Sequence, residues 1–154
     1  MKIRVLHVDD DAFTREVTHT ALTSFGFEAQ AVSSAAEFIA ALEEFDPHVV
    51  LVDLDLGAGP NGVQLLQLVE RDAPWVGKVI VSSHRSPSLV DPAGGKLTDL
   101  SYIVKSDLAS SDQLREAIEA TLAGETFIVN DDGDAARLTS AQAEVLRMLA
   151  ARSP

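Results

Sequence analysis

Four carboxylates, two hydroxyls and one ammonium group stand at or just after the ends of apolar runs. They belong to Asp9, Asp10, Asp53, Asp55, Ser82, Ser83 and Lys105. Crowded carboxylates need a cation, and oxygen ligands without His or Cys suit Mg²⁺ or Mn²⁺. A carboxylate beside a metal ion and a lysine can attack phosphorus, while the two cations neutralise the transferring phosphoryl group. These residue types are therefore sufficient for aspartyl-phosphate chemistry, provided that the fold brings them together.

Short apolar runs alternate with amphipathic segments along the chain, and this order predicts a parallel α/β sheet. The expected strands are 3–8, 28–32, 49–52, 79–81 and 102–104, and the expected helices are 12–25, 34–45, 61–72 and 110–123. Two prolines and two glycines in 85–96 leave room for only a short or broken helix there. Strands this apolar require helices on both faces. The predicted fold is a (βα)5 doubly wound parallel five-stranded sheet with an added C-terminal helix.

Local signals set several of these boundaries. Ser34 with Glu37 three residues later is a capping box that begins a helix, and Gly26 and Gly124 are typical helix ends.

In such a sheet the carboxyl ends of the strands share one edge, where ligands bind. The acids, Ser82 and Lys105 should therefore lie at that edge. Taken singly, each has a simpler interpretation: an Asp at a strand end is usually a turn or cap residue, and a Lys there is usually solvated. Their joint occurrence in this order favours a chemical site.

Bulk composition narrows the class of protein. The chain has 154 residues, 46% of them hydrophobic, which suits one compact domain with a short appendage. A formal net charge of −12 disfavours nucleic acid and anionic membranes as partners. The chain has no cysteine, which excludes disulfides and zinc-thiolate sites. No signal peptide or membrane span is predicted, so we expect a soluble cytoplasmic protein.

Four segments together resemble the receiver domain of two-component response regulators. They read "VLHVDDD", "VVLVDLDL", "VIVSSH" and "SYIVKSD". They match the acidic pair, the phospho-acceptor strand, the hydroxyl strand and the aromatic-plus-lysine strand of that family, and the resemblance covers residues 2 to about 125. It implies a flavodoxin- or CheY-like fold. It also implies a signalling switch, phosphorylated by a sensor histidine kinase, that catalyses only its own phosphorylation and dephosphorylation.

The resemblance assigns roles to the residues that match. It makes Asp53 the phospho-acceptor and Asp9 and Asp10 the pair that holds Mg²⁺ (or Mn²⁺), Asp10 more directly. Asp53 joins that metal site, and the backbone carbonyl of Asp55 would be its third protein ligand. Lys105 would pair with a phosphoryl oxygen.

The remaining matches concern the switch. Ser82 would be the switch hydroxyl and Tyr102 the switch aromatic, while Ser83 takes the small-residue position. Ser101 stands where the family usually has glycine, and 85–99 is poor in helix formers where the fourth helix belongs. With the fifth strand and fifth helix, that region is the face through which a homodimer would form.

The C-terminal residues resemble regulators of the NarL/FixJ type. On this interpretation 1–125 is the receiver, 126–137 a linker, and 138–154 the first helix of a LuxR-type helix-turn-helix; Thr139 with Gln142 is a further capping box. The recognition helix does not follow, so DNA would be bound only through a domain missing from this chain. Alternatives are a stand-alone receiver and a helix that only packs on a neighbour.

Two other functions stay open. A pseudo-receiver would bind a partner without phosphorylation. A phosphatase of the haloacid-dehalogenase type would use Asp53 and Asp55 as its paired acids, but that leaves Asp9 and Asp10 unexplained. The histidines show no ligand spacing and are expected to be structural or on the surface; they are His7, His19, His48 and His84.

Overall fold

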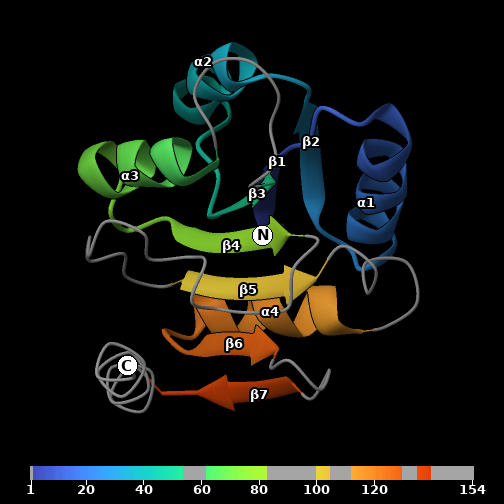
Figure 1. Ribbon diagram of the computed structural model, residues 1–154, viewed down its shortest axis with the longest axis vertical. Helices are drawn as coiled ribbons and strands as arrows, with labels where there is room; N and C mark the ends of the chain where they lie inside the picture. The colour runs from blue at the N-terminus through green and yellow to red at the C-terminus, as the bar shows by residue number, and fades with distance from the viewer. Residues whose placement is uncertain (1, 54–61, 83–99, 105–111, 130–134, 140–154) are drawn as a thin grey trace, which may run out of the picture.

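The computed structural model describes residues 2–53, 62–82, 100–104, 112–129 and 135–139, and its main feature is a parallel sheet (Figure 1). Its strands lie in the order β2-β1-β3-β4-β5. They are β1 (Arg4–Val8), β2 (Glu28–Val32), β3 (Val49–Asp53), β4 (Gly77–Ser82) and β5 (Leu100–Val104). The predicted α/β class with a parallel sheet is confirmed.

Helices cover both faces of the sheet. Those in the described residues are α1 (Ala12–Ser24), α2 (Ala35–Phe45), α3 (Gly62–Asp72) and α4 (Gln113–Leu122). Figure 1 shows α2 and α3 together on one side of the sheet and α1 on the other. The segment 83–99 between β4 and β5 lies outside the described residues, as do residues 140–154. The fivefold βα repeat and the C-terminal helix therefore remain predictions.

The helix ends follow the local signals in the sequence. The Ser34 hydroxyl accepts a hydrogen bond from the Glu37 amide at 3.2 Å, and the Glu37 carboxylate accepts one from the Ser33 amide at 2.7 Å. The bonds that the Glu37 carboxylate accepts from the Ser33 amide and then from the Ser33 hydroxyl lower the pKa of Glu37. Gly26 and Gly124 follow α1 and α4 with φ of 91° and 77°, a backbone conformation that suits glycine. None of the described helices has the length and apolarity needed to cross a membrane.

A buried ion pair joins α3 to β4. The Lys78 side chain is fully buried, and its ammonium lies 2.7 Å from the Glu70 carboxylate and 3.0 Å from the Val76 carbonyl oxygen. These partners compensate for the loss of water around the charge. On the other face, a Cβ at position 77 would overlap the Thr121 side chain, so Gly77 lets α4 approach β4 closely.

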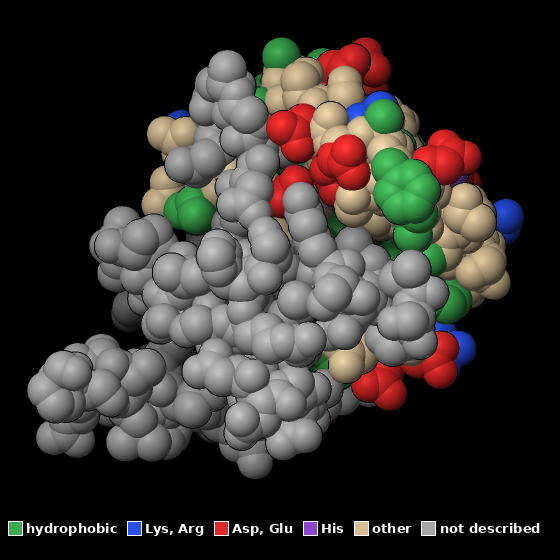
Figure 2. Space-filling view, turned by 45° about the vertical axis from the view of Figure 1, so that its right-hand side comes forward, with side chains coloured by type: hydrophobic (Ala, Val, Ile, Leu, Met, Phe, Trp, Pro, Cys, Tyr) green, Lys and Arg blue, Asp and Glu red, His purple; other side chains and the backbone are tan. Residues whose placement is uncertain are grey.

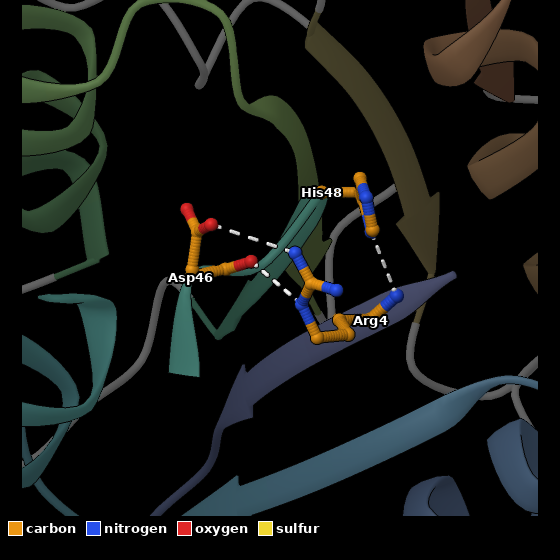
Figure 3. A network of polar contacts seen from close by, with 3 residues as sticks. All are labelled: Arg4, Asp46 and His48. Carbon is orange, nitrogen blue, oxygen red and sulfur yellow. Dashed lines mark hydrogen bonds and ion pairs between the residues drawn. The ribbon is translucent and has the colours of Figure 1, made fainter. Parts of the chain in front are cut away.

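A polar network joins β1 to β3 at the amino-terminal edge of the sheet (Figure 3). The Arg4 amide donates to Nδ1 of His48 at 2.9 Å, and the Arg4 guanidinium donates to the Asp46 carbonyl at 2.8 Å. Asp46 ends α2 in a left-handed conformation with φ of 51°. The network lies at the end of the sheet opposite Asp53 and is a structural contact between neighbouring strands.

A hairpin follows α4 and packs beside β5. It comprises β6 (Thr126–Val129) and β7 (Ala135–Leu138), which pair antiparallel. The Phe127 amide donates to the Ser101 hydroxyl at 3.0 Å, and Phe127 itself is buried. Ser101 lies 2.7 Å from the Thr121 hydroxyl, which donates to the Ala117 carbonyl. Ser101 must therefore donate to Thr121, and the chain of hydrogen bonds runs in one direction from the hairpin to α4.

The sequence prediction for this segment was wrong in its secondary structure. The expected linker, 126–137, contains both strands of the hairpin, and Leu138 ends β7 rather than beginning a helix. The polar residues 131–134 suggested a linker, but the apolar residues on either side of them pair as strands. Phe127, in the first of these strands, is part of the hydrophobic core.

Replacing Ser101 with alanine tests the attachment of the hairpin. Ser101→Ala leaves the buried Phe127 amide without its acceptor, and we expect the free energy of unfolding to fall by about 1–3 kcal/mol. Urea unfolding measures the loss, and amide exchange at Phe127 should accelerate. The exposed Ser24→Ala is the matched control and should change stability by less than about 0.5 kcal/mol. Unchanged exchange at Phe127 would show that Ser101 does not hold the hairpin.

Candidate functional site

Three carboxylates meet at the carboxyl edge of β1 and β3. Oxygen atoms of Asp9, Asp10 and Asp53 all lie within 4.8 Å of one another. Val8 pairs with Val52, so Asp9 and Asp53 stand at neighbouring positions one step further along. Asp53 and Asp9 are 1% and 5% exposed, while Asp10 is open to solvent. The convergence predicted for these three acids is what the structure shows.

The turn between β1 and α1 holds Asp9 in place. The Asp11 amide donates to Oδ1 of Asp9 at 2.8 Å, and the Arg15 guanidinium donates to the Asp9 carbonyl at 2.8 Å. Asp11 is also the N-cap of α1, because its side chain accepts from the Thr14 amide at 2.9 Å. The helix therefore begins beside the cluster, and its partial positive charge favours the carboxylates.

A buried histidine lies below the acids. His7 is 1% exposed, and its ring lies 5.7 Å from that of His19 in α1. Burial, with smaller effects of His19 and Arg15, lowers the pKa of His7 to about 3. The imidazole is therefore neutral at physiological pH. His7 lines a small cavity with Asp9 and Asp53, and the other lining residues are Val8, Thr18, Leu51 and Val81.

The cluster fits a hard divalent cation. Three negative groups this close repel one another. At the dielectric of a protein surface, the repulsion is a few kcal/mol for each pair, from roughly 332/(εr). Their ligand atoms are all oxygens, as Mg²⁺ and Mn²⁺ prefer, and the exposed Asp10 leaves the cluster open to solvent. Asp9, Asp10 and Asp53 are thus the described residues that could hold the cation.

The other predicted site residues are only partly described. Ser82 ends β4 beside the end of β3, and Tyr102 lies within β5, where it pairs with Ile80. These positions are those of their backbones. Asp55, Ser83 and Lys105 lie outside the described residues.

The surface around the site is acidic. Figure 2 shows several Asp and Glu side chains on the described part of this face, with few Lys or Arg among them. This agrees with the net charge of −12. A cationic ligand or a positively charged partner surface would be attracted to it.

The sheet order and the acid cluster define a receiver domain with the CheY-like fold. The family profile described as "Response regulator receiver domain" matches residues 5–119. The chain therefore belongs to the response regulator receiver family, as the sequence motifs predicted.

Named relatives support the same family. The chain is similar to the alginate biosynthesis transcriptional regulatory protein AlgB of Pseudomonas aeruginosa, with 33% identity over 74% of this chain and 24% of that protein. It is also similar to the DNA-binding response regulator MtrA of Mycobacterium tuberculosis, with 33% identity over 47% of this chain and 32% of the relative. The chain thus spans about a quarter to a third of these relatives.

A solved structure shares the fold. It is a CheY-like receiver domain protein from Methanospirillum hungatei, with a TM-score of 0.62, 25% identity, and coverage of 79% of this chain and 97% of that chain.

Asp10→Asn tests the electrostatics of the cluster. Removing one of three crowded charges should raise the melting temperature in EDTA by about 2–4 °C, equivalent to about 1 kcal/mol. Mg²⁺ should stabilise the wild type more than the variant, because the variant offers one charged ligand fewer. Thermal unfolding at equal ionic strength measures both effects. Glu44→Gln removes an exposed charge on α2 and should respond to Mg²⁺ as the wild type does. An equal response in Asp10→Asn would exclude Asp10 from the cation site.

Proposed function

We propose that this chain is a phosphorylation switch in which Asp53 accepts a phosphoryl group from a sensor histidine kinase. The observation that supports this most directly is the position of Asp53. Its carboxylate is 1% exposed at the end of β3, and those of Asp9 and Asp10 lie within 4.8 Å. A nucleophile held in place beside a cation site is the arrangement that phosphoryl transfer needs.

The transfer is an in-line displacement. One Asp53 oxygen forms a bond to phosphorus while the bond from phosphorus to the leaving imidazole nitrogen breaks, and its electron pair stays with the imidazole. A bound Mg²⁺ supplies positive charge that favours the phosphoryl oxygens. Asp9 and Asp10 would hold that ion, with the Asp55 carbonyl as a further ligand, and Lys105 would pair with a phosphoryl oxygen.

Phosphorylation would then bias two conformations of the domain. The Ser82 hydroxyl turns toward the phosphoryl group and the Tyr102 ring follows it inward. The change reaches the face formed by 85–99, β5 and α4, where a homodimer would assemble. Two named relatives are transcriptional or DNA-binding regulators by their descriptions. We therefore include in the proposal an output that acts on transcription, a C-terminal region of the NarL/FixJ type, and a cytoplasmic location.

Two alternatives receive less support. A haloacid-dehalogenase-type phosphatase would give no role to Asp9 and Asp10, whereas the structure groups both with Asp53. A pseudo-receiver would give no role to the cation site as a whole. Turnover of a small phosphate ester would support the first alternative.

The proposal predicts covalent labelling of one residue. Incubation with acetyl phosphate and Mg²⁺ should add one phosphoryl group to the intact mass, because Asp53 has its nucleophilic oxygen beside the cation site. Asp53→Asn and addition of EDTA should each abolish the gain. Asp72→Asn, an exposed acid at the end of α3, is the control and should be labelled as the wild type.

Transfer from a phosphorylated histidine kinase domain is the second arm of this test, since it uses the donor that the proposal names. No mass gain from either donor would exclude phosphorylation and favour the pseudo-receiver. A gain that persists in Asp53→Asn would place the acceptor elsewhere.

A further inference from the structure

His7 is a polar residue in an apolar strand. It stands between Leu6 and Val8 in β1, and all three side chains are buried. Within the described part of the chain, neither of its ring nitrogens has a hydrogen-bond partner. A buried polar group in this state destabilises the fold relative to an apolar residue of similar volume. Packing alone therefore does not account for histidine at this position.

The ring lies on the same face of the sheet as the phospho-acceptor. His7 pairs with Leu51, and Asp9 and Asp53 stand two positions further along the same strands. Side chains two apart in a strand point to one face, so the imidazole and both carboxylates share that face, beneath α1. All three line the same cavity.

The cavity suits a single water molecule. Its volume is about 10 Å³, close to the smallest that holds one water. A buried water needs two to four polar partners, and the lining offers an imidazole nitrogen, a threonine hydroxyl and two carboxylates. A ring nitrogen of His7 can exchange a hydrogen bond with such a water.

We propose that His7 is a positioning residue, which holds one buried water and through it fixes the orientation of the Asp53 carboxylate. This inference rests on the proposed function, because the orientation matters only if Asp53 is the nucleophile. With one carboxylate oxygen bonded to the water, the other is directed at the incoming phosphorus. His7 lies beside the cation site and is not one of its ligands, since within the described residues the group of mutually close ligand atoms is formed by the three aspartates.

His7→Val is the decisive variant, because valine has a similar volume and suits a buried parallel strand. We expect its rate of phosphorylation by acetyl phosphate to fall by about tenfold, as a misplaced reacting group lowers the rate. We expect its melting temperature to stay equal or rise by about 2–4 °C. His7→Asn and His7→Gln restore a polar atom near Nδ1 and Nε2, and at least one of them should recover most of the rate. A structural role predicts the opposite combination: lower stability with an unchanged rate.

The matched control is His19→Gln. His19 contacts the His7 ring but does not line the cavity, so this variant should be phosphorylated at the wild-type rate. Calorimetric titration with beryllofluoride in Mg²⁺ gives a readout that needs no phosphoryl donor, and the affinity should fall in His7→Val but not in His19→Gln.

The possible results separate the two proposals. A wild-type chain that neither gains a phosphoryl group nor binds beryllofluoride would overturn the proposed function. A wild-type chain that does both, with His7→Val equal to it in rate and affinity, would overturn the role of His7 alone. Recovery by neither polar variant, with a loss of melting temperature in all three, would assign His7 to packing.

Discussion

Three carboxylates at one end of the sheet repel one another, and the arrangement of the residues around them depends on that repulsion. Asp9 and Asp53 are nearly inaccessible to solvent, so water screens them poorly. Backbone groups at the start of α1 contribute positive partial charge beside the carboxylates. The Asp11 amide donates to Asp9, and α1 begins alongside. Arg15 donates to the Asp9 carbonyl and leaves the carboxylates to other partners. The negative charge is retained, and a divalent ion is the ligand that it suits.

The residue beneath the three carboxylates, His7, is also compatible with a site that retains its negative charge. A positively charged side chain at position 7 would neutralise the acids from below and weaken a cation site. The His7 ring is held neutral because burial lowers its pKa to about 3. Elsewhere the fold does bury a cation: Lys78 lies on β4 and is paired with Glu70 of α3. The two faces of the sheet thus carry different charged groups: a lysine–glutamate ion pair on the α3 side and the cluster of aspartates on the α1 side.

The elements that carry the acids could be predicted because their signals are local. The run from Val49 to Val52 is apolar at every position, so a strand that ends at Asp53 follows directly. Features that depend on tertiary contacts could not be predicted. The burial of Lys78 depends on its contact with Glu70, and β4, which contains Lys78, begins two residues earlier than expected. In the sequence, His7 stands out only as a polar residue in an apolar strand, two positions before Asp9. Its place beside Asp53 becomes clear only from the cavity that both residues line.

The hairpin also depends on tertiary contacts, so it was not predicted from the sequence. Its attachment to β5 bears on the proposed output. Ser101 stands where the receiver family usually has glycine, a residue that could not accept from the Phe127 amide through a side chain. The serine makes β6 a neighbour that is bonded to β5, the strand that carries Tyr102. Ser101 also bonds Thr121, so one side chain of β5 contacts both α4 and the hairpin. The hairpin is therefore joined to β5 and α4 through a short chain of hydrogen bonds.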